Sequence, residues 1–451
     1  MDPVKVSVIN SFGMGITLLM CLLMLALPRR YALLPVLVLT CYMSMGQRMV
    51  IANLDFTMIR ILVMFGWLRV LVRGEFARLK LSKVDKILIA WVVSGTVLYC
   101  VLWGTTAALI NRLGHAYDAI GLFFLFRVLI RSREDVDQMV RIFAVCIVPL
   151  AALIIGEKVS GHNVFAIFGG VSDITVVRDG VRRCQGPFAH PILAGTFAAT
   201  NASFFIAFLW RQGRDRVLAV AGVLACIAIA VCSGSSGPVM SFGWAVLGFC
   251  LWPLRKRMRL MRWGLAFLII GLQLVMKAPV WFLIGRISVF DGSTGFFRAR
   301  LIDAAITNFF GWWLIGTQAT AQWGTGLFDI TNQYIAEGVN GGVLTMGLFI
   351  LLIARSFGTV GRTVRQIRNS PKSVKIGTWA LGCALLAHAT TYISVSYFDQ
   401  NIVTWFLLLA VISGCATFPV RSVALGRASR VAKMGSAVLS AIPPTALQET
   451  V

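Results

Sequence analysis

Residues 217–233 read VLAVAGVLACIAIAVCS, a run of seventeen positions without a charged side chain. A run of this length matches the reach of an α-helix across the hydrocarbon core of a bilayer. Comparable runs recur along the 451-residue chain, in which 58% of the residues are hydrophobic and 13% are charged. Because helices satisfy their own backbone groups where no water is available, the repetition predicts an all-α, polytopic transmembrane protein.

The sequence predicts about 12 to 13 spans within one transmembrane domain that covers residues 1–451. Two of the connecting segments, 156–190 and 282–340, are longer than the others and contain aromatic, aliphatic and paired charged residues. We expect these two segments to be folded outer loops. The spans are expected near residues 11–27, 32–47, 55–72, 87–103, 115–130, 139–155, 191–210, 217–233, 238–254, 263–281, 341–357, 377–395 and 402–418.

Lysine and arginine are unevenly distributed between the two sides of the predicted bundle. With the N-terminus outside, the inner loops hold 28 Lys and Arg against 7 Asp and Glu, whereas the outer segments hold 11 of each. This positive-inside pattern predicts an outer N-terminus and an inner C-terminus, with a basic tail at 421–451. The net charge of +24 then reflects topology and contact with membrane lipids, so no nucleic-acid partner is expected.

The larger outer loop contains the stretch SVFDGSTGFFRARLIDAAITNFFGWWLIG, residues 288–316. The spacing of its apolar residues predicts an amphipathic helix near 294–310, capped by Ser293 or Thr294 and lying along the outer membrane surface. One face of this helix would carry Phe297, Leu301, Ala305 and Phe309, and the other Arg300, Asp303 and Thr307.

Arginines on the predicted outer side are the first candidate ligands. Arg182 and Arg183 precede a span, and Arg298 and Arg300 belong to the predicted amphipathic helix. Guanidinium groups bind phosphate oxygens in a bidentate way, so this placement predicts a binding site for a diphosphate. The alternative is that the arginines form structural ion pairs with nearby acids, as the i,i+3 spacing of Arg300 and Asp303 favours.

A second candidate site is the polar stretch FDITNQYIAEGVNGG, residues 328–342. Asp329 or Glu337 would accept a proton from a sugar hydroxyl, as a general base must, and Asn332 would position that sugar. The alternative is that Asp329 caps a helix beginning near Thr331 while Glu337 is solvated.

Two further residues are candidates for binding the substrate. His190, in AHPILAG, would hydrogen-bond a ligand or serve at the start of a span. Arg60 lies inside a predicted span, where a charge is a functional candidate by default, although snorkelling toward Asp55 competes with that role. The four histidines show no spacing typical of a metal site, and we expect no metal and no cofactor.

With these stretches in hand, residues 140–360 resemble the O-antigen ligase and polymerase superfamily of bacterial polysaccharide assembly. RCQGPFAHPILAGTF resembles the Arg–x–x–Gly segment of the family and aligns Arg183 with an arginine that handles the lipid diphosphate. FRARLIDAAITNFFGWWLIG resembles its second arginine segment, carried by Arg300. Ligases have a histidine followed by Asn, Ser or Gln, and further residues at spacings matched here by Asn332, Gly342 and Thr345, but Thr331 occupies the histidine position.

The missing histidine favours the similar Wzy-type polymerases over the ligases. The resemblance implies a glycosyltransferase at the periplasmic face of the bacterial inner membrane, with its C-terminus in the cytoplasm. It would transfer a glycan from a polyprenyl diphosphate to a sugar hydroxyl of a lipid-linked repeat unit. The partners implied are that lipid-linked oligosaccharide, membrane lipids, a chain-length regulator and a flippase. The alternatives are a ligase acting on lipid A core and, from another class, a flippase for lipid-linked oligosaccharides.

Overall fold

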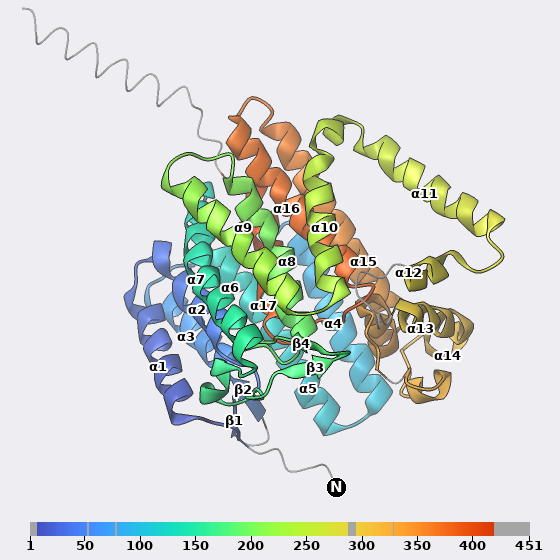
Figure 1. Cartoon of the computed structure of the whole chain (residues 1–451), viewed down its shortest axis with the longest axis horizontal. Coiled ribbons are helices and arrows are strands. Elements are labelled where there is room, and N and C mark those ends of the chain that lie inside the picture. The colour runs from blue at the N-terminus through green and yellow to red at the C-terminus, as the bar shows by residue number, and fades with distance from the viewer. Residues whose placement is uncertain (1–6, 52–53, 77–78, 287–294, 328, 419–451) are drawn as a thin grey trace, which may run out of the picture.

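The computed structural model describes residues 7–51, 54–76, 79–286, 295–327 and 329–418, and most of them are helical (Figure 1). The predicted basic tail at 421–451 and the predicted caps Ser293 and Thr294 lie outside the described residues. The helices are α1 (Ser11–Ala26), α2 (Leu33–Tyr42), α3 (Met58–Val72), α4 (Lys83–Trp103), α5 (Thr106–Ala116), α6 (Leu122–Leu129), α7 (Arg133–Ser160), α8 (Pro191–Phe208), α9 (Arg214–Cys232), α10 (Ser236–Cys250), α11 (Met258–Val275), α12 (Leu283–Arg286), α13 (Gly295–Thr307), α14 (Phe309–Trp312), α15 (Gln333–Gln366), α16 (Lys372–Thr391) and α17 (Asn401–Cys415).

Two short antiparallel hairpins are the strand pairs in the described part of the chain. Strand β1 (Arg48–Ile51) pairs with β2 (Leu54–Thr57), and β3 (Val176–Arg178) pairs with β4 (Val181–Arg183). The predicted all-α class is therefore confirmed. Within the described residues, six helices are long and apolar enough to cross a membrane, namely α4, α7, α8, α9, α11 and α15. The count of 12 to 13 spans and the orientation of the termini stay predictions.

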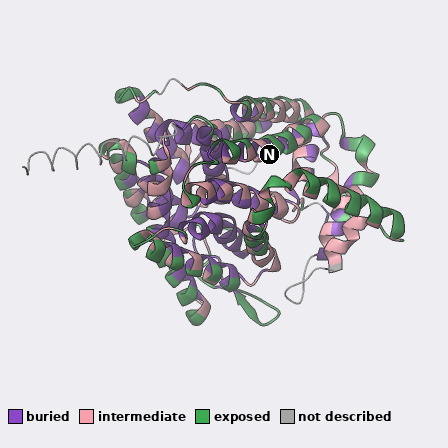
Figure 2. Ribbon diagram, turned by 90° about the horizontal axis from the view of Figure 1, so that it is seen from above, coloured by how far each residue is buried: buried purple, intermediate pink, exposed green. Residues whose placement is uncertain are grey.

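Helix α8 lies at the centre of the bundle. It packs against α9, α10 and α16, and nearly all of its residues are buried. Small residues allow this close packing: a Cβ on Gly195 would lie 2.6 Å from Ser233 Oγ in the turn between α9 and α10. Figure 2 shows the buried residues gathered in the middle of the bundle. The N-terminal end of α8 is thereby held against the start of α10, which positions the candidate site.

Helix α15 contains a break in its backbone where the polar stretch ends. Gly341 and Gly342 leave helical geometry, and Gly342 has a φ of 66°. A Cβ on Gly342 would lie 2.3 Å from the carbonyl oxygen of Leu314, so a side chain at this position meets backbone. The break separates the polar first turns of α15 from its apolar continuation.

We expect Gly342→Ala to destabilise the protein by about 1–3 kcal/mol, because alanine in this conformation is strained and collides with Leu314. The thermal unfolding midpoint in detergent measures the loss. Gly347→Ala is the matched control, since nothing lies within 4 Å of its added methyl group. It should leave the midpoint unchanged or raise it. Equal midpoints for the two variants would contradict the assignment of strain to Gly342.

Helix α13 covers most of the segment predicted to be amphipathic. Leu301 and Ala305 are buried and form a small core with Leu327 and with Ile335 and Val339 of α15. Most of the predicted apolar face therefore packs against the protein, while Phe309 is exposed. The placement of the helix along the membrane surface stays a prediction. Helix α11, by contrast, extends away from the bundle and buries none of its residues (Figure 1).

Candidate functional site

Arg183 ends strand β4 and points into the protein. Only 7% of its surface is exposed, and its Nη2 donates to Ser235 Oγ at 2.6 Å. Its Nε has no hydrogen-bond partner among the described residues. Burial lowers the pKa of the guanidinium, and the nearby Arg178 lowers it further. An arginine remains charged under these conditions, so Arg183 brings a buried positive charge with unused hydrogen-bonding capacity.

The start of α10 lies directly against Arg183. Ser235 is the N-cap residue of this helix but makes no capping hydrogen bond, because its hydroxyl donates to Ser233 O at 3.1 Å and accepts from Arg183. The N-terminus of a helix favours negative charge. The turn CSGSSGP at 232–238 was not predicted to carry chemistry, although serines before a proline are a recognisable signal for the start of a helix.

Arg298, on α13, also lies near the start of α10. Its Nη2 lies 4.0 Å from the position that a Cβ on Gly237 would occupy, and Ser394 Oγ lies 3.8 Å from that position. Burial lowers the pKa of Arg298. Among the described residues, neither Arg183 nor Arg298 forms an ion pair with a carboxylate. We call this group, made of Arg183, Arg298 and residues 235–237, the arginine site; its chemistry suits an anion with several oxygens.

His190 and Asp329 lie beside the arginine site. His190 is the N-cap residue of α8, and its Nδ1 accepts a hydrogen bond from the amide of Ile192 at 3.2 Å. The pKa of His190 is lowered by burial and by the charge of Arg183, while Asp329 acts in the opposite direction. The neutral ring therefore carries its proton on Nε2 and acts as a hydrogen-bond donor. Asp329 itself is exposed.

Glu337 lies in a separate cavity of about 420 Å³ between α4, α5, α15 and α17, which we call the carboxylate cavity. Its Oε2 accepts from Trp91 Nε1 at 2.8 Å and its Oε1 accepts from Gln333 Nε2 at 2.7 Å. Arg112 also lines the cavity. The remaining wall is strongly aromatic and contains Phe349, Tyr392, Tyr397, Phe398, Trp405 and Phe406. Aromatic walls around a few fixed polar groups are typical of a pocket for an organic ligand.

The segment between α16 and α17, residues 393–400, joins the two places. Ser394 faces the start of α10, and residues 396–398 of the same segment line the carboxylate cavity. Asn332 holds this segment, since its Nδ2 donates to Ile393 O at 3.1 Å. Asn332 also caps α15, because its Oδ1 accepts from the amide of Ile335 at 3.2 Å. The alternative expectation that Asp329 caps this helix is therefore wrong.

Three other predicted ligands lie away from the arginine site. Arg300 is exposed and lies beside Gly324, on a different face of α13 from Arg298. Arg182 is exposed and donates to the carbonyl groups of residues 158 and 159. Arg60 forms an ion pair with Asp118 through contacts of 2.8 and 2.7 Å, so its charge is neutralised.

The predicted alternative of an ion pair between Arg300 and Asp303 is also wrong for the residues described. Asp303 instead accepts a hydrogen bond from Trp281 Nε1 at 3.2 Å. No group of three or more His, Cys, Asp or Glu residues that could hold a metal ion occurs in the described parts of the chain.

Asp399 lies beside His190 and was not predicted from the sequence. It adopts a φ of 65°, is 7% exposed, and accepts from the amide of Ala189, next to His190, at 2.8 Å. Its Oδ1 has no partner among the described residues. Burial raises the pKa of Asp399 to about 7. A lone aspartate after an aromatic residue gives no sequence signal for such burial.

The pKa of Asp399 predicts how stability depends on pH. The folded protein holds this proton between about pH 4 and pH 7 whereas the unfolded chain releases it, so stability falls as the pH rises through this interval. At about 1.4 kcal/mol per pH unit, the total is about 4 kcal/mol. Asp399→Asn keeps the acceptor for Ala189 and tolerates the positive φ. We expect its unfolding midpoint to exceed that of the wild type at pH 8 but not at pH 4; equal midpoints at both pH values would contradict the assignment.

The arrangement combines two arginines without a carboxylate partner among the described residues, an imidazole donor and a cavity that contains a carboxylate. These groups come from segments that are far apart in the sequence, around residues 183, 235, 298, 329–337 and 393–399. No protein-family model matches the chain, and no curated protein matches it either.

Proposed function

We propose that the chain is a membrane glycosyltransferase of the polysaccharide-polymerase type. It would transfer a glycan from a polyprenyl diphosphate to a sugar hydroxyl of a lipid-linked repeat unit. The observation that carries the proposal is the convergence of Arg183 and Arg298, both without a carboxylate partner among the described residues, on the start of α10. The segment at residues 393–400 links this site to the cavity that holds Glu337.

In this proposal the arginine site binds the diphosphate. Two guanidinium groups and a helix N-terminus provide donors for several phosphate oxygens at once. The same groups stabilise the negative charge that develops on the diphosphate as it leaves the sugar. Ser235 orients Arg183, and His190 donates through Nε2 to an oxygen of the same group.

The carboxylate cavity holds the acceptor sugar in this proposal. The acceptor hydroxyl oxygen attacks the anomeric carbon of the donor glycan, and the bond from that carbon to the diphosphate oxygen breaks. The hydroxyl proton passes to the carboxylate of Glu337, and the polyprenyl diphosphate departs with the bonding electron pair. Asp329 is the alternative proton acceptor, since it lies near His190. Asn332 positions the segment at 393–400, which lies between the arginine site and the carboxylate cavity.

The polymerase is preferred to a ligase because Thr331 occupies the histidine position of the ligase motif. The reaction would take place at the periplasmic face of a bacterial inner membrane, where lipid-linked oligosaccharides supply both donor and acceptor. The proposed mechanism needs no nucleotide, because the diphosphate lipid is the activated donor.

The test is to incubate the purified protein with lipid-linked repeat units and without nucleotide sugars. A ladder of longer lipid-linked glycans is expected. Transfer to lipid A core without a ladder would replace the polymerase with a ligase. Movement of the lipid headgroups across a vesicle bilayer with no new glycosidic bond would overturn the enzyme proposal in favour of a flippase.

A further inference from the structure

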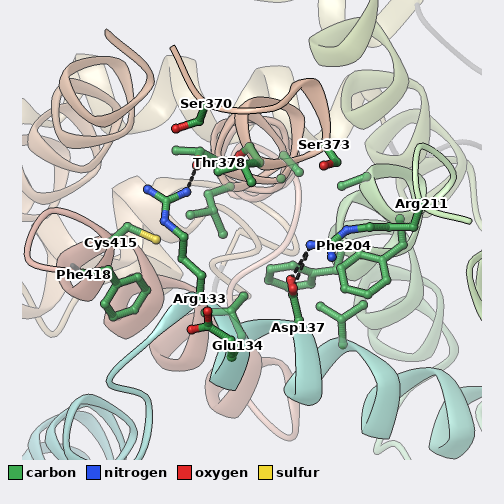
Figure 3. Close-up of a pocket in the computed structure, with 18 of the residues that line it drawn as sticks. Arg133, Glu134, Asp137, Phe204, Arg211, Ser370, Ser373, Thr378, Cys415 and Phe418 are labelled. Atoms are coloured by element: carbon green, nitrogen blue, oxygen red, sulfur yellow. Dashed lines mark hydrogen bonds and ion pairs between the residues drawn. The ribbon is translucent and has the colours of Figure 1, made fainter. Parts of the chain in front are cut away.

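A second cavity of about 530 Å³ lies at the other end of α8 from His190. Figure 3 shows the residues that line it. It is enclosed by the beginning of α7, the end of α8, the beginning of α16 and the end of α17, and we call it the α16 cavity. Since α8 runs from Pro191 to Phe208 and the cavity touches Phe204 and Phe208, the arginine site and the α16 cavity lie at opposite ends of the bundle.

The α16 cavity contains one positive charge without a counter-ion. Arg133 Nη1 lies 3.4 Å from Thr378 Oγ1, and Arg133 forms no ion pair with a carboxylate among the described residues. The neighbouring Arg211 differs, because Asp137 binds it at 2.7 and 2.8 Å (Figure 3). Arg211 also lies over the ring of Phe208. Arg133 is therefore the cation available to a ligand.

The start of α16 adds further donors to the same cavity. Pro371 is the N-cap residue of α16. Its side chain makes no capping hydrogen bond to the first amides of the helix. Ser370 and Ser373 line the cavity as well, and Thr378 Oγ1 is the hydroxyl in contact with Arg133 (Figure 3). A guanidinium, hydroxyl groups and a helix N-terminus together suit a phosphate group.

One negative charge lies on the same wall. Glu134 follows Arg133 in the first turn of α7, lines the cavity, and forms no ion pair in the described part of the chain. With Asp137 and Arg211 neutralising each other, the unpaired charges are one cation and one anion. The rest of the wall is apolar and includes Val140, Phe204, Leu381 and Phe418.

We propose that the α16 cavity binds a zwitterionic glycerophospholipid with a phosphate and a primary ammonium group. The phosphate lies between Arg133 and the start of α16, the ammonium is bound by Glu134, and an acyl chain covers the apolar wall. The lipid would stabilise the packing of α7, α8, α16 and α17 around the α16 cavity. This proposal does not depend on the proposed glycosyltransferase activity.

The test measures lipid retention by native mass spectrometry, together with thermal unfolding of the full chain after exchange into defined lipids. Dioleoylphosphatidylethanolamine is expected to remain bound to the wild type and to raise its unfolding midpoint more than dioleoylphosphatidylglycerol does. Equal retention and stabilisation by the two lipids would overturn the role of Glu134. Equal stabilisation by soluble glycerophosphoethanolamine would show that the cavity takes a free phosphate ester rather than a lipid.

Single substitutions test the proposed contacts of the phosphate and of the ammonium group. Arg133→Gln should lower retention of both lipids at least tenfold, whereas Glu134→Gln should remove only the preference for the ethanolamine lipid. Arg216→Gln is the matched control, because this exposed arginine near the start of α9 does not line the cavity. Wild-type retention in Arg133→Gln would overturn the proposal. If Arg133→Gln does not fold, Ser373→Ala provides the same comparison, with a smaller loss of both lipids expected and no loss contradicting the site.

Discussion

Arg183→Gln is expected to lower the rate of glycan transfer by about 10²–10³-fold, the usual effect of removing one donor that stabilises charge in the transition state. The buried guanidinium is held by Ser235 at 2.6 Å and has no carboxylate partner among the described residues. It is therefore available to the diphosphate as negative charge develops on it. Arg183→Lys should recover part of the rate, because lysine keeps the charge but not the planar fork.

Protein stability separates this role from a structural one. A buried charge without a counter-ion is costly to the fold, so Arg183→Gln should leave the unfolding midpoint unchanged or raise it while activity falls. If Arg183 were structural, the midpoint and the activity would fall together. The ladder assay with lipid-linked repeat units and a melting curve in the same detergent give the two readings.

Two arginines serve as matched controls for Arg183. Arg182→Gln changes the adjacent residue of β4, whose side chain is exposed and bonded to carbonyl groups of α7. Arg300→Gln changes the face of α13 that points toward Gly324 rather than toward α10. Both variants should keep transfer within about threefold of the wild type. Full activity in Arg183→Gln, or a larger loss in Arg300→Gln than in Arg298→Gln, would contradict the arginine site.

The fold class was accessible from the sequence because it depends on local composition. Each long apolar run predicts a helix without reference to its neighbours, and each expected span overlaps a helix of the described structure. The position of Arg183 beside a span was accessible for the same reason. The choice between Arg298 and Arg300 was not, since it depends on how α13 packs on α15.

Tertiary contacts also explain why Ser235 and Asp399 could not be predicted from the sequence. Ser235 matters because α8 and the turn before α10 approach closely at Gly195. Asp399 is buried because its segment folds back onto Ala189, which lies 210 positions earlier in the chain. Hydrophobic periodicity and motif spacing contain no information about such contacts. The preference of helix N-caps for Asn and Asp is local, but it applies equally to Asn332 and Asp329 and so does not choose between them.

Glu337→Gln is expected to lower kcat of the proposed transfer by about 10²–10⁴-fold, the usual contribution of a positioned general base. The amide has nearly the same size but cannot accept the hydroxyl proton. Trp91 and Gln333 fix the carboxylate, and Gln333 is itself held because its Oε1 accepts from the amide of Tyr397 at 2.7 Å. The acceptor is bound by the cavity wall as a whole, so KM should change by less than about threefold.

Asp329→Asn is the matched variant, because Asp329 is the other carboxylate of the polar stretch and lies near His190. Its side chain is exposed and does not line the carboxylate cavity. We therefore expect it to retain most of the activity under conditions in which Glu337→Gln is inactive. Trp91→Phe removes one donor to Glu337 but leaves the proton acceptor in place, so its kcat should fall by about tenfold or less. The opposite result, with Asp329→Asn inactive and Glu337→Gln active, would assign the general base to Asp329. The acceptor sugar would then lie beside His190 rather than in the carboxylate cavity.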